Sequence, residues 1–134
     1  MSQHLFTQLI DQAKNEANKH HVNISISCVD DSGLLRNFIR MDDAVAGSVD
    51  VAIKKARTAA LFGTNSLELG QYAQPGGSIY TLEHTNGGLI SFGGGVVVKD
   101  AQGKILGALG VAGATVELDQ EIAVAAVEKV MKSV

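Results

Sequence analysis

Three consecutive glycines, Gly93, Gly94 and Gly95, stand between the apolar runs 90–92 and 96–98. Glycine inside an ordered element costs roughly 0.5–1 kcal/mol relative to alanine, because its backbone loses the most freedom on folding. A run of three therefore predicts either unusual backbone angles or the close approach of another group to the backbone. A ligand, a neighbouring helix or another subunit would each satisfy this pattern, and the sequence leaves the three open.

The composition favours one domain with a core of small side chains. The chain has 134 residues, of which 46% are hydrophobic and only 4% are aromatic. Its formal net charge is -3 and its 11 Lys and Arg are scattered, whereas a nucleic-acid surface needs a basic patch. No apolar stretch reaches the roughly 18 residues of a membrane span, and no leader pattern is visible. We therefore expect residues 1–134 to form a single cytoplasmic domain without nucleic-acid or membrane partners.

The hydrophobic pattern predicts an α+β fold with an antiparallel sheet of about five strands. Strands are expected at 24–29, 34–41, 89–92, 96–99 and 104–111. Helices are expected at 2–20, 48–62 and 119–130, with a short one within 65–73. Ser2, Ser48 and Asp119 are the expected N-terminal caps, and Gly63 is the expected terminator of the second helix. Because the strands cluster rather than alternate with helices, a sheet covered by helices is the natural arrangement.

Four histidines are candidate metal or haem ligands, because imidazole is a common ligand of both. His4 lies in the first turn of the first helix and could project into a partner or a haem pocket. His20 and His21 follow the end of that helix, where capping or solvation is the simpler interpretation. His84 lies in the segment 80–86, which is expected at the rim of a site.

The sequence contains no pattern that specifies a reaction. The Gly-x-Ser-x-Gly pattern is absent, and the triple glycine lacks the Lys-Ser/Thr that follows in a phosphate-binding loop. The carboxylates Asp42, Asp43, Glu83 and Asp119 belong to separate elements. Cys28, the one cysteine, lies in an alternating apolar run and is interpreted as a buried structural thiol.

Basic residues leave two interpretations open. A glycine-lined apolar site with Arg40, Lys54, Lys55 and Arg57 at its rim would suit a flat ligand that bears carboxylates, because Arg and Lys pair with carboxylates. The same residues are equally consistent with an ordinary solvated helix face.

Six strings occur in a fixed order: RMD at 40–42, AIKKARTA at 52–59, QPGGSIY at 74–80, TNGG at 85–88, FGGG at 92–95 and GALGVAG at 107–113. Together they resemble the GlcG/HbpS family of haem-binding or haem-degrading-like domains, and they are most similar to its PduO C-terminal-type branch. The strings span nearly the whole chain. Two departures are Val96-Val97-Val98, where the family often has a proline, and Ala112, where it often has a serine. Both weaken a shared binding site and leave the fold expectation intact.

The resemblance implies a profilin-like α-β-α sandwich around a five-stranded antiparallel sheet, homo-oligomers, and haem binding in some members. His4 is then the expected axial ligand of the haem iron, with His21 behind it. The whole expected cofactor site comprises His4, His21, Arg40, His84, Gly93, Gly94 and Gly95. PduO-type proteins join this domain to a cobalamin adenosyltransferase, so a corrinoid enzyme or an adenosyltransferase is an expected partner. Adenosyltransferase activity itself is not implied for this chain.

The residues and the resemblance together lead to three hypotheses about function. The first is a small-molecule-binding accessory protein, for haem or a related tetrapyrrole, in a cobalamin-dependent diol, glycerol or glycolate pathway. The second is a cofactor-free oligomeric scaffold of such a pathway. The third is an enzyme acting on haem or a small hydroxy acid, and it ranks last because no catalytic constellation can be assembled from the sequence.

Overall fold

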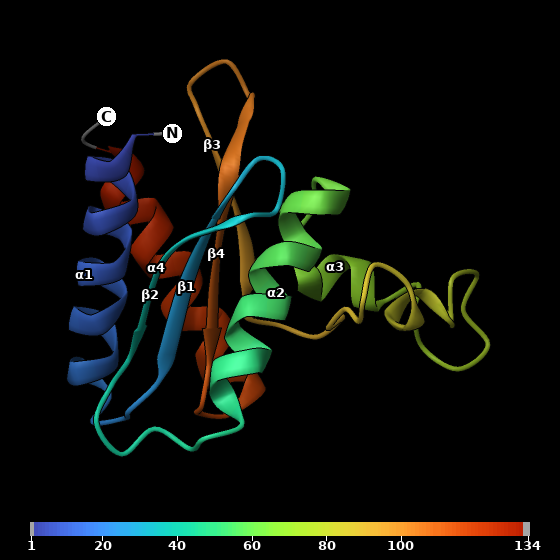
Figure 1. The fold of residues 1–134 in the computed structure, drawn as a ribbon, viewed down its shortest axis with the longest axis horizontal. Coiled ribbons are helices and arrows are strands. Elements are labelled where there is room, and N and C mark those ends of the chain that lie inside the picture. Colours follow the sequence, from blue (N-terminus) through green and yellow to red (C-terminus); the bar gives the residue numbers. More distant parts are fainter. Residues whose placement is uncertain (1, 133–134) are drawn as a thin grey trace.

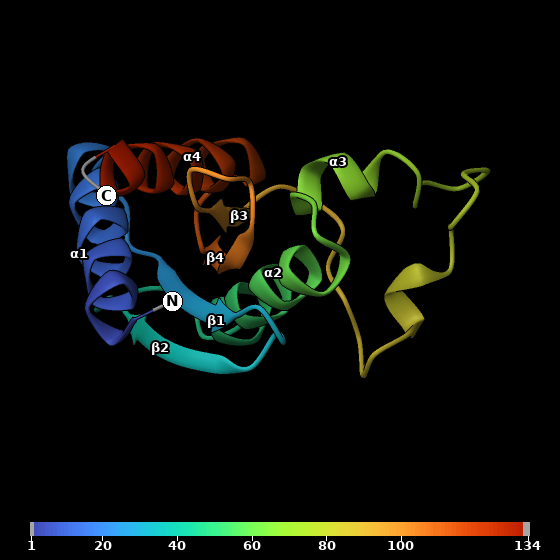
Figure 2. The same cartoon turned by 90° about the horizontal axis from the view of Figure 1, so that it is seen from above.

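The computed structural model describes residues 2–132, in which a four-stranded antiparallel sheet lies between two layers of helix. The helices are α1 (Gln3–Lys19), α2 (Ser48–Phe62), α3 (Ser66–Gly70) and α4 (Val116–Lys132), with a 3-10 turn at Leu82–His84. The strands are β1 (Ser25–Asp30), β2 (Leu35–Arg40), β3 (Gly95–Lys99) and β4 (Ile105–Ala112), in the order β2-β1-β4-β3. Helices α1 and α4 cover one face of the sheet and α2 covers the other (Figures 1 and 2). The α+β class and the antiparallel sheet are thus confirmed.

Strand β4 shows why the two faces carry different helices. Leu109 and Val111 point into the core shared with α1 and α4, whereas Ala108 and Gly110 face α2. Side chains alternate between the two faces of a strand, so large and small residues in alternation give one bulky and one flat face. A Cβ added at Gly110 would overlap the carbonyl oxygen of Ala52 in α2. The flat face therefore allows the backbone of α2 to lie unusually close to the sheet.

Buried serines fix α2 on this flat face. The Ser27 hydroxyl donates a hydrogen bond to the Ala52 carbonyl at 2.7 Å. The Ser25 and Ser48 hydroxyls lie 2.8 Å apart, and Ser48 donates its own proton to the Val45 carbonyl at 2.6 Å. Since a hydroxyl has one proton, Ser25 is the donor to Ser48. The Ser25 and Ser27 hydroxyls of β1 thus both donate to groups of α2.

The expected strand at 89–92 does not form, so the sheet has four strands and the prediction of five is wrong. The Ile90 N–H donates to the Thr58 hydroxyl at 3.1 Å, and the Ser91 N–H donates to the Glu83 carboxylate at 2.9 Å. Side chains from elsewhere in the chain therefore take the donors that a fifth strand would have given to a neighbouring strand.

Two expected helix ends and the expected thiol are confirmed. The Ser2 hydroxyl accepts the Leu5 N–H at 3.3 Å and caps α1. Gly63 ends α2 with φ 66°, in the left-handed region. Cys28 is free and buried, and burial raises the pKa of its thiol to about 12.

Two expected caps are wrong. Gly47 holds the N-cap position of α2, and Ser48 is the first helical residue. Helix α4 begins three residues earlier than expected, because the Thr115 hydroxyl accepts the Leu118 N–H at 3.1 Å. This frees the Asp119 carboxylate for other contacts.

The segment between α3 and β3, residues 71–94, extends away from the sheet as an arm and returns to it at Gly94, whose carbonyl accepts the Val111 N–H at 2.9 Å (Figures 1 and 2). It contains the one proline of the chain, Pro75, and the 3-10 turn. Among residues 2–132, none of the helices has the length and apolar character needed to cross a membrane. The profilin-like class and the single-domain boundary at 1–134 stay predictions.

Candidate functional site

Two cavities meet at Phe92, where the arm joins the body of the protein. The larger, here called the arm cavity, has a volume of about 450 Å³ and is lined by Ala73, Gln74, Pro75, Tyr80, Thr81, Glu83, His84, Ser91 and Phe92. The smaller, here called the lysine cavity, has a volume of about 300 Å³ and is lined by Val45, Gly47, Ser48, Val51, Lys55, Phe92, Ala112, Gly113, Ala114, Val116 and Asp119. Both volumes fit small molecules.

The arm cavity combines two aromatic side chains with several polar groups. Tyr80 and Phe92 are 55% and 41% exposed, so both present ring surface to a ligand. The Glu83 carboxylate accepts hydrogen bonds from the Ser91 N–H at 2.9 Å and the Ser91 hydroxyl at 2.6 Å, which closes a loop over residues 83–91 within the arm. His84 lies in the 3-10 turn and has an exposed imidazole. This cavity therefore offers a partly aromatic surface with one imidazole.

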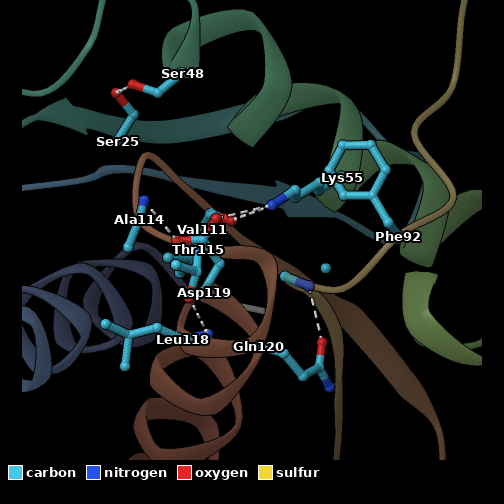
Figure 3. A network of polar contacts seen from close by, with 12 residues as sticks. Ser25, Ser48, Lys55, Phe92, Val111, Ala114, Thr115, Leu118, Asp119 and Gln120 are labelled. Atoms are coloured by element: carbon cyan, nitrogen blue, oxygen red, sulfur yellow. Dashed lines mark hydrogen bonds and ion pairs between the residues drawn. The ribbon is translucent and has the colours of Figure 1, made fainter.

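The lysine cavity has an ion pair at its base. The side chains of Lys55 and Asp119 are 1% and 3% exposed, and their Nζ and Oδ2 atoms lie 3.2 Å apart. Figure 3 shows Nζ directed toward this carboxylate and the Val111 carbonyl, to which it donates at 2.9 Å. Nζ also lies 5.1 Å from the centroid of the Phe92 ring. The prediction of Lys55 as a rim or solvated residue is wrong, because α2 turns it toward the sheet.

Burial shifts both members of this pair toward their neutral forms. It lowers the pKa of Lys55, and the charge and hydrogen bond of Asp119 oppose this shift. It raises the pKa of Asp119, and Lys55 together with the N–H groups of Ala114 and Gly113 oppose that shift. The Ala114 N–H donates to Asp119 Oδ1 at 3.0 Å. Each member of the pair thus offsets part of the desolvation of the other.

The glycine run is explained by the helices that pack against it. Gly94 has φ +126°, and a Cβ added there would lie 2.7 Å from Lys55 Nζ. A Cβ at Gly95 would overlap the backbone carbonyl of Lys55, and one at Gly93 would lie 3.1 Å from Gln120 Cβ. The sequence left open whether a ligand, a neighbouring helix or another subunit approaches these glycines. In the structure, neighbouring helices lie against them. Contact of these glycines with a ligand stays a prediction.

The other expected site residues do not converge within one chain. His4 is exposed in the first turn of α1, and His21 follows its last turn with φ 57°. A helix of 17 residues is about 25 Å long, so the two histidines mark its opposite ends. Arg40 ends β2 and donates to the Ala44 carbonyl at 2.6 Å and 3.0 Å. His84 alone of the expected histidines lines one of the two cavities.

The remaining basic residues serve separate contacts. Lys54 Nζ lies 3.0 Å from the Asp50 carboxylate, one turn earlier on α2. Arg57 donates to the Asn86 carbonyl at 3.1 Å and so connects α2 to the arm. The four basic residues named from the sequence therefore form no common rim. Within residues 2–132, no group of three or more His, Cys, Asp or Glu side chains could hold a metal ion.

Sequence reasoning missed the pairing of Lys55 with Asp119, which are 64 residues apart. A usable signal was present on α2. Ala52, Lys55, Ala56 and Ala59 follow the spacing i, i+3, i+4, i+7, which places a lysine on the face otherwise made of alanines. A lysine on a buried face needs a partner, and an acidic residue near the start of α4 could have been named as a candidate.

Residues 1–128 match the family model described as haem degrading protein HbpS-like. The chain is 40% identical over 121 residues to the corrinoid adenosyltransferase PduO of Citrobacter freundii. The matched region covers 90% of this chain and 36% of PduO. The chain thus spans little more than a third of the length of that relative.

Two solved structures are similar over almost the whole chain. One is the Klebsiella pneumoniae protein ORFY, at 32% identity and a TM-score of 0.94, covering all of this chain and 92% of the other. The other is the PduOC:haem complex, at 37% identity and a TM-score of 0.90, covering 96% of this chain and 93% of the other.

Proposed function

We propose, from the premise that the chain belongs to the HbpS-like family, that it is a haem-binding accessory protein. The observation that carries this proposal is the likeness to PduOC, a protein of the same fold whose structure holds haem. We place the protein in a cobalamin-dependent diol, glycerol or glycolate pathway, because its relatives include a corrinoid adenosyltransferase. A cytoplasmic location is part of the proposal and agrees with one free, buried cysteine.

The arm cavity suits a flat aromatic ligand. Its volume of about 450 Å³ lies in the usual range for cofactor sites, and Tyr80 and Phe92 supply ring surface for contact with a porphyrin. Haem iron is commonly held by a histidine nitrogen, and His84 lines this cavity. When bound, haem would supply an iron centre whose electronic properties depend on that axial ligand.

His4 and His21 stay in the proposal as alternative axial ligands. Both imidazoles are exposed, and neither lines one of the two cavities of a single chain. We assign these two histidines to a haem site formed between two copies of the chain. The three histidines therefore separate two modes of binding, one within a chain and one between copies.

Hemin titration of a set of histidine variants tests these assignments. The set comprises His84→Ala, His4→Ala and His21→Asn, the last because asparagine tolerates the left-handed backbone at φ 57°. His20→Ala is the matched control, since His20 is exposed beside His21 and has no proposed role. Far-ultraviolet circular dichroism first establishes that every variant is folded.

We expect the wild type and His20→Ala to give the same Soret band, and His84→Ala to lose or shift it. A His84→Ala variant with the wild-type spectrum would overturn the assignment to His84, and loss in His4→Ala or His21→Asn would then identify the ligand. No Soret change in folded wild-type protein with excess hemin would overturn haem binding itself.

An oligomeric interaction protein is the second candidate function, favoured by exposed apolar side chains. Leu34 is 65% exposed at the tip of the β1–β2 hairpin, and Phe62 is 41% exposed at the end of α2. The two ends are neighbours, because a Cβ at Gly33 would lie 3.0 Å from the Leu61 side chain. Such surface is suited to burial against a copy of the chain or against a corrinoid enzyme or adenosyltransferase of the pathway.

Sedimentation equilibrium of the wild type and of Leu34→Ser with Phe62→Ser tests this candidate. We expect the wild type to form a stable oligomer and the double variant to dissociate. A wild-type protein that stays monomeric at micromolar concentration would contradict the candidate.

A further inference from the structure

The lysine cavity joins an amine, a proton acceptor and an apolar space, and the haem proposal uses none of these. We propose that Lys55 is a carbonyl-reactive amine that forms a Schiff base with a short-chain aliphatic aldehyde bound in this cavity. The inference stands apart from haem binding, since it concerns a different cavity and a different chemistry.

The cavity selects for a small, uncharged and largely apolar molecule. Its walls are aliphatic or aromatic side chains and glycine, and its three polar side chains are Ser48, Lys55 and Asp119. Ser48 is already engaged with Ser25 and a backbone carbonyl. A volume of about 300 Å³ accommodates a chain of a few carbons, and Lys55 with Asp119 are left to bind its polar end.

A buried ion pair alone does not require such a space. In a close-packed interior the volume around a structural pair is filled by side chains, because voids lose dispersion contacts. Here a space of about 300 Å³ adjoins the pair, because both Lys55 and Asp119 line the lysine cavity. The Lys55 side chain is therefore buried and yet lies against a cavity.

The neighbouring Asp119 carboxylate allows the Lys55 amine to become neutral. A protonated amine has no lone pair, so Lys55 must lose a proton before it can attack a carbonyl carbon. Asp119 Oδ2 lies 3.2 Å from Nζ and can accept that proton. Burial favours the neutral form of both groups, which is the environment that activates lysine nucleophiles in apolar pockets.

The reaction then balances without an oxidant or a reductant. The amine nitrogen attacks the carbonyl carbon, a C–N bond forms, and the C=O electron pair moves to oxygen. A proton passes from nitrogen to that oxygen and gives a carbinolamine. Protonated Asp119 donates to the hydroxyl, water leaves, and the nitrogen lone pair forms the C=N bond. The product is a protonated imine facing the Asp119 carboxylate, so the buried pair of opposite charges is kept.

Reductive trapping on the wild-type protein tests the proposal. The protein is incubated at pH 7 with butanal and cyanoborohydride, which reduces an imine to a stable alkylamine, and each lysine is quantified by peptide mass spectrometry. Lys54 is the internal control, because it neighbours Lys55 on α2 and its side chain is 31% exposed. Because burial lowers the pKa of Lys55, more of its amine is free than that of an ordinary lysine at the same pH, and we expect Lys55 to carry more label than Lys54.

A sealed structural pair predicts the reverse. Lys55 would then be protected and would carry less label than Lys54, and that result would overturn the proposal. The pH dependence gives a second readout: because burial lowers the pKa of Lys55, label on Lys55 should rise less steeply from pH 7 to pH 9 than label on a lysine amine of ordinary pKa. Equal slopes would count against a specially activated amine.

A pair of tryptophan variants tests the route of access. Val116 lines the lysine cavity and is 38% exposed, so Val116→Trp fills the cavity from its open side. Glu117 is the next residue, is exposed, and lies outside the lining, so Glu117→Trp is the matched control. We expect the first variant to suppress labelling of Lys55 and the second to preserve it, with Lys54 unchanged in both. Label on Lys55 that survives in Val116→Trp would show entry by local unfolding and would overturn the cavity as the binding site.

Discussion

Removal of one partner of the Lys55–Asp119 pair should destabilise the fold strongly. Both side chains are at most 3% exposed, so either partner left alone is a buried charge without its counter-ion. Loss of one member of a buried pair costs about 3–5 kcal/mol of unfolding free energy. We therefore expect Lys55→Met and Asp119→Asn each to lose about 3–5 kcal/mol.

The double variant should lose less than the sum of the two single variants. It removes both charges, methionine fills most of the volume of lysine, and the asparagine oxygen still accepts the Ala114 N–H that now bonds Asp119. Replacement of a buried pair by neutral groups is often close to neutral in stability. We expect the double variant to be no less stable than either single variant, which corresponds to a coupling energy of about 3 kcal/mol or more.

Urea denaturation at one fixed protein concentration measures all four proteins, so that any association affects them equally. Lys54→Met with Asp50→Asn is the matched control cycle on α2, where the side chains are 31% and 71% exposed. An exposed i, i+4 pair contributes about 0.3–0.5 kcal/mol. Additive losses at Lys55 and Asp119, or single losses below about 1 kcal/mol, would refute the reasoning from burial.

Packing, acid stability and thiol reactivity give three further tests. A Cβ at Gly110 overlaps a carbonyl of α2, so Gly110→Ala should lose about 1–3 kcal/mol in urea denaturation. Gly47→Ala, with open space around it, should lose less than about 1 kcal/mol, and equal losses would contradict the close approach. Burial opposes ionisation of Glu16, but hydrogen bonds from two lysines and a glutamine hold its pKa below the ordinary 4.5. The stabilisation from ionised Glu16 is full above pH 4.5 and is lost as the pH falls through the lowered pKa that Glu16 has in the folded protein. Glu16→Gln should therefore flatten the decline of Tm from pH 6 to pH 3. An unchanged decline would contradict this expectation. Since burial raises the pKa of Cys28 to about 12, iodoacetamide at pH 8 should alkylate it only after denaturation, and rapid alkylation of the native protein would contradict its burial.

The elements that depend on local pattern were predicted from the sequence. Helix α1 and its Ser2 cap, helix α2 and its Gly63 terminator, and four strands all follow from periodicity and turn residues. The strand at 89–92 was wrong because its N–H groups bond the side chains of Thr58 and Glu83, which no local pattern reveals.

The candidate sites were predictable only in part. The triple glycine correctly indicated a close approach to the backbone, but only the tertiary structure identifies α2 as the group that approaches. Lys55 was grouped with Arg40, Lys54 and Arg57 as a cationic rim or a solvated helix face, and its partner Asp119 lies on a different helix 64 residues away. Pairs of this kind are set by the packing of two elements and leave no spacing in the sequence.

Hemin titration of the purified wild-type protein, followed by visible absorption at a verified oligomeric state, tests the central claim of haem binding most directly. We expect a saturable Soret shift that ends at one haem per chain, if His84 holds the iron within a chain, or at one haem per two chains, if His4 or His21 holds it between copies. A flat response to excess hemin would contradict haem binding and leave the oligomeric interaction protein as the function to pursue.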